Sequence, residues 1–243
     1  MPVFVCCFHG VHYRGLRAQS ECVYIFVRVR YGGGVNESIQ LLVGAIIAYL
    51  LGAIPVGLLV ARAKGVDIRS VGSGNIGATN VFRSIGKPWG VATFVLDALK
   101  GFVPAWVFPL WCADPGWSIG LLFGCMAIAG HNWPVYLGFK GGKGVATSAG
   151  VLLGVAPVEA LIGAGVWFAV FFVSRYVSLA SIAAAVAIPA AGWLRAEAHG
   201  PVLPVVLTLL GILAVWRHRS NIERLSNGTE NRFERKKNKG ESS

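Results

Sequence analysis

Charged residues, and acidic ones above all, are scarce in this chain of 243 residues. Asp, Glu, Lys and Arg together make up 14% of it, whereas 55% of the residues are hydrophobic. So little charge excludes an ordinary soluble domain. The five cysteines, at positions 6, 7, 22, 112 and 125, show no CxxC pairs and no clustering with histidine. We therefore expect neither a disulfide framework nor a metal site.

Long apolar runs take the place of the missing charge. A run of about 20 mainly apolar residues can cross a hydrocarbon core about 30 Å thick as a helix. The candidate spans are residues 39–61, 89–111, 117–137, 145–174, 176–194 and 201–216. These runs predict an all-α fold, that of a polytopic protein embedded in a lipid bilayer.

The run from 145 to 174 is too long for one span, because as a helix it would measure about 45 Å. The stretch 154–157, which ends in proline, is a place for a break. Splitting the run makes seven helices and collects sixteen basic residues on one face, with only Arg195 opposite. We therefore predict seven helices with the basic loops in the cytoplasm. Orientation also accounts for the net charge of +11, so we expect no nucleic-acid partner.

The first 34 residues fit this topology poorly. They would carry four arginines to the outer face, and they lack the layout of a signal peptide. One hypothesis is that translation begins at Val35, from a GUG codon read as methionine; the alternative is a disordered extension. We accordingly divide the chain into an extension at 1–34, a transmembrane domain at 35–230 and a basic cytoplasmic tail at 231–243.

A first glycine-rich loop lies between the first two spans, where residues 71–83 read VGSGNIGATNVFR. Glycines allow a positive φ, so that successive amides can cup an oxyanion, and Arg83 can add a bidentate clamp. The polar side chains beside these glycines are Ser73, Asn75 and Asn80. The loop is thus a candidate anion site; the alternative is a flexible loop in which Ser73 or Thr79 caps the next helix.

A second glycine-rich loop, residues 130–144, reads GHNWPVYLGFKGGKG and includes Lys140 and Lys143. Lysines among glycines suit phosphate. The loop is not a Walker A motif, because Gly144 stands where Ser or Thr is needed, so we do not expect nucleotide hydrolysis. The alternative is a basic interfacial turn that only fixes topology.

Polar residues within or beside the spans have two interpretations each. Asp97 and Lys100 lie three residues apart on one helix face, as a functional pair or as an internal ion pair. Ser178 and Ser181 either face a site or bond to the backbone. After the last span, residues 217–230 read RHRSNIERLSNGTE. If the helix continues there, His218 shares a face with Asn221 and can act near neutral pH; the alternative is an orientation signal.

Taken together, residues 72–83, 130–144 and 217–230, with LDALKG at 96–101, resemble the signature regions of the bacterial acyl-phosphate:glycerol-3-phosphate acyltransferases. The resemblance runs from about Asn36 to Glu230. It implies transfer of a fatty acyl group from acyl phosphate to the sn-1 hydroxyl of glycerol 3-phosphate. The products are lysophosphatidic acid and inorganic phosphate, in the first step of phospholipid synthesis. It also implies seven helices in the bacterial inner membrane, with the active site facing the cytoplasm.

The resemblance assigns Ser73 and Arg83 to the first essential region and His218 and Asn221 to the reactive centre. We predict that Ser73, His218 and Asn221 are catalytic, and that either His218 or a substrate phosphate oxygen takes the hydroxyl proton. The predicted substrate-binding residues are Asn75, Asn80, Arg83, Lys100, His131, Lys140, Gly141, Gly142, Lys143, Gly144, Ser178 and Ser181. The lysine loop is assigned to acyl phosphate and the first loop to glycerol 3-phosphate, although the two assignments could be exchanged. We expect a monomer with no metal and no cofactor.

Two other classes of function compete with this prediction. A transporter of a phosphorylated small molecule would also use broken helices and buried charges, but the chain shows no obvious internal repeat. A lipid alcohol phosphotransferase would need metal-binding carboxylates. Outside the ambiguous run, Asp97 is the only acidic residue within a span.

Overall fold

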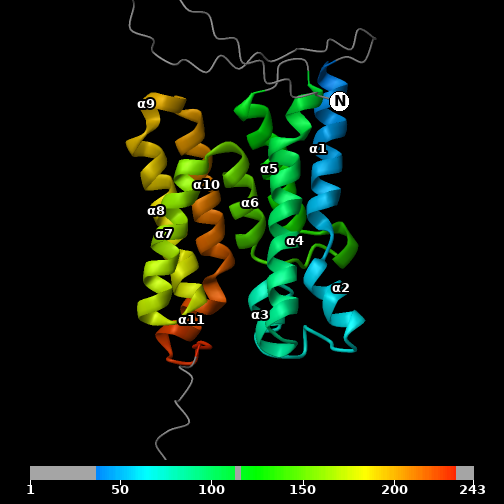
Figure 1. Cartoon of the computed structure of the whole chain (residues 1–243), viewed down its shortest axis with the longest axis vertical. Coiled ribbons are helices and arrows are strands. Elements are labelled where there is room, and N and C mark those ends of the chain that lie inside the picture. The colour runs from blue at the N-terminus through cyan, green and yellow to red at the C-terminus, as the bar shows by residue number, and fades with distance from the viewer. Residues whose placement is uncertain (1–36, 113–115, 234–243) are drawn as a thin grey trace, which may run out of the picture. The chain divides into compact units, whose positions relative to one another are not determined.

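The computed structural model describes residues 37–112 and 116–233, and every regular element within these ranges is a helix. Figure 1 shows the helices running side by side. An all-helical membrane protein was predicted, and this fold class is confirmed. The hypothesis about a start at Val35 concerns residues outside the described ranges, as does most of the predicted basic tail.

The helices fall into two groups along the chain. The first group is α1 (Glu37–Ala53), α2 (Val56–Ala63), α3 (Ala78–Ser84), α4 (Lys87–Trp106), η1 (Phe108–Trp111), α5 (Trp117–Asn132), η2 (Val135–Leu137) and α6 (Val145–Val155). The second group is α7 (Pro157–Ser174), α8 (Val177–Leu194), α9 (Ala196–His199), α10 (Val202–Arg217) and α11 (Arg219–Ser226).

Four helical stretches are long and apolar enough to cross a membrane: Glu37–Ala63, Lys87–Trp111, Pro157–Ser174 and Val177–Leu194. A fifth is α10 if it is taken together with α11, from which it is bent by 54°. The helices α5 and α6 are shorter, so the predicted count of seven spans is approximate.

The long run from 145 to 174 is broken at Ala156, as predicted. Pro157 has no amide hydrogen and disfavours helical backbone in the residue before it. The amide of Ala156 still donates to the Leu152 carbonyl at 2.7 Å, which closes α6, and Pro157 begins α7. The break turns the chain back toward the loops that contain the glycines.

The helices pack in two sets, which Figure 1 shows as α1 to α6 and as α7 with α8 and α10. Small residues bring the backbones together: a Cβ on Gly150 would lie 1.9 Å from the Ala98 carbonyl oxygen, so α6 can approach α4 only with glycine there. Large apolar side chains such as Phe172 and Leu194 are 73% and 88% exposed. Outward-facing apolar surface of this kind suits lipid. Figure 1 also shows α3 and α11 at the same end of the helices, opposite α9.

Candidate active site

A chain of hydrogen bonds joins the second glycine-rich loop to α11 and to the residues after it. The Lys143 ammonium donates to Asn221 Oδ1, and Asn221 Nδ2 donates to Glu230 Oε1 at 2.8 Å. Asn221 is buried in the first turn of α11. Two residues predicted from separate motifs are thus in direct contact.

Glu230 lies at the centre of this network, although no role was predicted for it from the sequence. Besides Asn221, it accepts hydrogen bonds from Ser178 Oγ at 2.8 Å and from Arg224 Nε at 2.7 Å. Burial opposes the charge of Glu230, but the hydrogen bonds from Asn221, Ser178 and Arg224 outweigh it and lower the pKa of this carboxyl. The signal for Glu230 was an acidic residue ending a stretch rich in arginine.

Lys143 is the cation that faces this network. Burial lowers the pKa of its ammonium to about 8, and the arginines 224, 217 and 83 lower it further while Glu230 raises it in part. A lysine in this state loses its proton readily, and a phosphate anion beside it would stabilise the charged form. Such a group is suited to bind an anion that arrives and leaves.

His218 lies where the last span bends. A helix continuing past the membrane was one prediction for this segment, but α10 ends at Arg217 and α11 starts at Arg219. His218 and Asn221 are nevertheless both buried, and the Asn221 amide donates to the His218 carbonyl at 2.8 Å. His218 Nδ1 lies 2.8 Å from the Ala214 carbonyl oxygen, which can only accept. Nδ1 therefore carries the hydrogen, and in the neutral ring Nε2 keeps a lone pair.

Arg217 holds the second loop in place from another helix. Its Nε donates to the Gly142 carbonyl and its Nη2 to the Gly141 carbonyl, each at 3.1 Å. The amides of these two glycines donate to the carbonyls of His131 and Asn132 at the end of α5, at 3.1 and 3.3 Å. The predicted phosphate cradle is therefore narrower than expected, because these two amides are used within the fold.

Glycine is required at position 142 by the closeness of His131. A Cβ there would lie 2.2 Å from His131 Nε2. His131 itself is 6% exposed and lies under the loop, with Nδ1 3.7 Å from Asp97 Oδ1. It supports the loop and does not reach the surface where a substrate would bind.

Lys100 has the internal interpretation of the two that were open. Its ammonium lies 2.8 Å from Asp97 Oδ1 and donates to the Ile54 carbonyl at 2.8 Å, where α1 breaks before α2. Both side chains of the pair are buried. Lys100 thus closes a helix break, and its predicted contact with substrate is replaced by this role.

The first glycine-rich loop is organised by Asn80. The Asn80 side chain donates to the carbonyls of Ile68 and Val71 at 3.1 and 3.0 Å and accepts from the Ser73 amide at 3.0 Å. It is 3% exposed, so it shapes the loop and is not a contact for substrate. Ser73 is exposed at the loop surface, between two glycines that have positive φ.

The remaining predicted residues differ in their surroundings. Asn75 and Lys140 line a cavity of about 340 Å³ together with Arg217, on the surface between the two loops. Ser181 Oγ bonds to the Val177 carbonyl at 2.8 Å, which is the backbone interpretation of that residue. Gly144, with φ of 77°, directly precedes α6.

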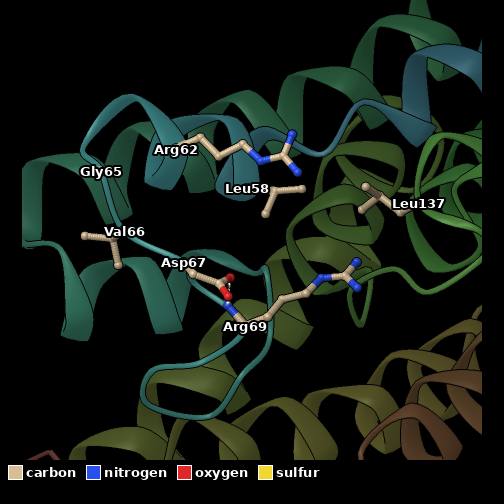
Figure 2. A pocket seen from close by; sticks show the side chains of 7 residues that line it. All are labelled: Leu58, Arg62, Gly65, Val66, Asp67, Arg69 and Leu137. Atoms are coloured by element: carbon tan, nitrogen blue, oxygen red, sulfur yellow. Dashed lines mark hydrogen bonds between the residues drawn. The ribbon is translucent and has the colours of Figure 1, made fainter.

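A second, larger cavity of about 450 Å³ lies beside the first loop. Figure 2 shows two of its lining residues, Arg62 and Arg69, extending their guanidinium groups in the same direction, toward Leu137. Arg69 also lines the smaller cavity, and its Nη2 donates to the Lys140 carbonyl at 2.9 Å. A basic surface thus leads from the first loop to the second.

Comparison with known proteins agrees with this arrangement. The family model described as glycerol-3-phosphate acyltransferase matches residues 42–228. A glycerol-3-phosphate acyltransferase of Geobacter sulfurreducens is 48% identical over 77% of this chain and 94% of its own length. One of Aquifex aeolicus is 46% identical over 77% of this chain and 96% of its own.

Two solved structures are also similar. Both are of PlsY (YgiH), an integral membrane glycerol 3-phosphate acyltransferase, and each comparison covers 80% of this chain and 96% of the other. The glycerol 3-phosphate form has a TM-score of 0.74 at 45% identity, and the lysophosphatidic acid form 0.72 at 44%. This chain belongs to the glycerol-3-phosphate acyltransferase family.

Proposed function

We propose that this protein transfers a fatty acyl group from acyl phosphate to the sn-1 hydroxyl of glycerol 3-phosphate. The products are lysophosphatidic acid and inorganic phosphate, and the reaction begins phospholipid synthesis. The observation that carries the proposal is the convergence of Lys143, Asn221, Glu230 and the buried His218 between loops rich in glycine and cations. Family membership and the glycerol 3-phosphate and lysophosphatidic acid forms of a similar structure support it.

The basic loops face the cytoplasm of a bacterial inner membrane in this proposal, following the distribution of positive charge. A site at that boundary brings together a donor with an alkyl chain, which enters from the bilayer, and an acceptor dissolved in water. The exposed apolar side chains of α7, such as Phe172, are on the side of the protein available to lipid.

The donor phosphate binds at Lys143. Gly144 opens α6 directly after this lysine, and the amides of the first helical turn favour an anion. Arg217 and His131 hold the loop in position through its backbone. Acyl phosphate is already an activated mixed anhydride, so the protein has to position it and offset the charge on the departing phosphate.

The acceptor phosphate binds at the first loop, to Arg83 with Ser73 and Asn75. The sn-1 oxygen attacks the acyl carbon, a carbon–oxygen ester bond forms, and the bond from that carbon to the phosphate oxygen breaks. His218 Nε2 accepts the hydrogen bond of the hydroxyl and orients it. The proton passes to an oxygen of the departing phosphate, because protonating the imidazole would bury a second positive charge beside Lys143.

The role of His218 can be tested with His218→Gln, whose side-chain oxygen can still accept a hydrogen bond. We expect a fall in kcat of about tenfold at saturating acyl phosphate, because orientation is weakened while the proton acceptor is retained. A general base would be worth about 10²- to 10⁴-fold. A loss of that size would give the proton to His218.

The donor is tested by product formation. Purified protein is given labelled glycerol 3-phosphate with acyl phosphate, acyl-CoA or an acyl carrier protein thioester, in separate reactions. We expect lysophosphatidic acid from acyl phosphate alone. Equal product from a thioester would contradict the donor assignment, and no product from any donor would contradict the acyltransferase activity. A Lys143→Met sample controls for contaminating enzymes.

A further inference from the structure

Three residues, Asn231, Arg232 and Phe233, follow residue 228, where the family match ends, and are called the C-terminal strap. Their backbone and side chains are fixed to the end of α7. The Phe233 amide donates to the Arg175 carbonyl at 3.0 Å, and Arg232 Nε donates to the Ser174 carbonyl at 3.1 Å. The strap is therefore held by specific bonds and not merely laid on the surface.

The ring of Phe233 lies between two helices that are distant in sequence. It meets Phe82 of α3 at 5.8 Å between centroids and Phe171 of α7 at 5.6 Å, both edge to face. Such aromatic pairs favour one relative orientation over others. The strap thus links the helix that follows the first loop to the second set of helices.

The same strap holds the Arg83 guanidinium in two ways. Arg83 Cζ lies 4.5 Å from the centroid of the Phe233 ring, and Arg83 Nη2 donates to the Asn231 carbonyl at 2.9 Å. A guanidinium is planar and has five N–H donors. A ring against its face and a carbonyl at one edge define the direction in which another edge can meet a phosphate.

We propose that Phe233 is a positioning residue, which orients Arg83 to bind the phosphate of a substrate. The inference rests on the proposed function, in which Arg83 contacts glycerol 3-phosphate. Phe233 touches no substrate and acts through Arg83. The proposal differs from a purely structural role, in which the aromatic group would only hold α3 against α7.

The experiment compares Phe233→Leu with Phe233→Tyr in the full chain, each with and without Arg83→Ala. Leucine keeps the apolar volume and removes the π face, whereas tyrosine keeps both. Phe172→Leu is the matched control, because Phe172 belongs to the same aromatic group but is 73% exposed and stacks its ring near Phe168 and Phe171.

We expect Phe233→Leu to raise the KM for glycerol 3-phosphate by about threefold to tenfold, the range of a cation–π contact of this kind. The kcat should stay close to that of the unaltered protein, and tyrosine should restore the KM. Phe172→Leu should change neither constant. In the Arg83→Ala background, Phe233→Leu should add nothing further.

Several outcomes would overturn the proposal. These are an unchanged KM in Phe233→Leu, an equal further loss in the Arg83→Ala background, or a fall in kcat that parallels a fall in thermal stability. If Arg83→Ala alone leaves both KM values unchanged while product still forms, the role of Arg83 fails and the acyltransferase activity stands. If the KM for acyl phosphate rises instead, Phe233 still acts through Arg83, and the two phosphate sites are exchanged.

Discussion

The two glycine-rich loops are fixed in opposite ways. The first is organised from within, because one side chain, Asn80, binds the backbone on both sides of the turn. The second is held from outside, by the end of α5 and by Arg217 from α10. One loop is a local structure, and the other exists only when the distant helices are assembled.

The difference extends to the cation that each loop presents. Arg83 is half-buried, lies against the C-terminal strap and keeps its charge at any pH of interest. Lys143 is in contact with Asn221, and its pKa is lowered to about 8 by burial. The first loop therefore offers a permanent charge, and the second a charge that depends on what is bound beside it.

The largest effect is expected from Lys143→Met, which keeps the length of the side chain and removes its charge. Loss of one preorganised donor to a developing anion typically costs about 10²- to 10³-fold in kcat. We expect a loss of that order in steady-state kcat, with a smaller change in the KM for glycerol 3-phosphate.

Lys140→Met is the control within the same loop. Lys140 is exposed, and the hydrogen bond that it accepts from Arg69 uses the main-chain carbonyl, which the substitution retains. We expect less than about a threefold change, as for a surface charge screened by water. Equal losses in the two variants would show that the second loop acts through its overall charge and not through Lys143.

Asn80→Ala is expected to have the next largest effect, because it removes the internal support of the first loop. The carbonyls of Ile68 and Val71 and the amide of Ser73 would lose their partners, at a cost of about 2 to 4 kcal/mol in the free energy of unfolding. We expect a lower midpoint of thermal unfolding and a raised KM for glycerol 3-phosphate, while the KM for acyl phosphate changes little.

The control for the first loop is Asn75→Ala, at a residue whose side chain accepts a hydrogen bond from the Gly77 amide at 3.3 Å. It should raise the KM for glycerol 3-phosphate without a marked change in thermal stability. If Asn80→Ala instead weakened both substrates equally, the two loops would not be independent structures.

The contrast also explains what could be predicted from the sequence. The helices follow from apolar runs, and the break at Ala156 follows from proline and the length limit of a span. Lys143 and Asn221 were selected by chemistry and do meet. Asn80 and Lys100 were assigned to substrate because a polar residue in a motif looks the same whether it faces a ligand or a backbone carbonyl. Only the fold shows which carbonyls, such as that of Ile54, need a partner.

Glu230 and Phe233 were missed for a related reason. Glu230 acquires its role from Ser178, Asn221 and Arg224, and Phe233 from Phe82 and Phe171, each across a distance in sequence that no local pattern records. Residues that bind one another across helices have no spacing rule. Their roles are visible only when the helices are packed.

The smallest expected effect is in the pH dependence, where the two cations should differ. The folded pKa of Lys143, about 8, is below its ordinary value of 10.5. Between these values the unfolded chain binds more protons than the folded one, so this group makes the fold more stable as pH rises through that window. Binding of acyl phosphate has the opposite sign, because it needs the charged lysine.

Initial rates from about pH 7 to 9.5 should therefore show a KM for acyl phosphate that is flat below about pH 8 and rises above it, by at most about tenfold per pH unit. The KM for glycerol 3-phosphate should stay flat, because Arg83 keeps its charge. Lys143→Arg should remove the slope even if it lowers the rate. A slope that persists in Lys143→Arg would assign it to another group, and a slope in the KM for glycerol 3-phosphate instead would place Lys143 with the acceptor, so that the permanent charge would serve the donor.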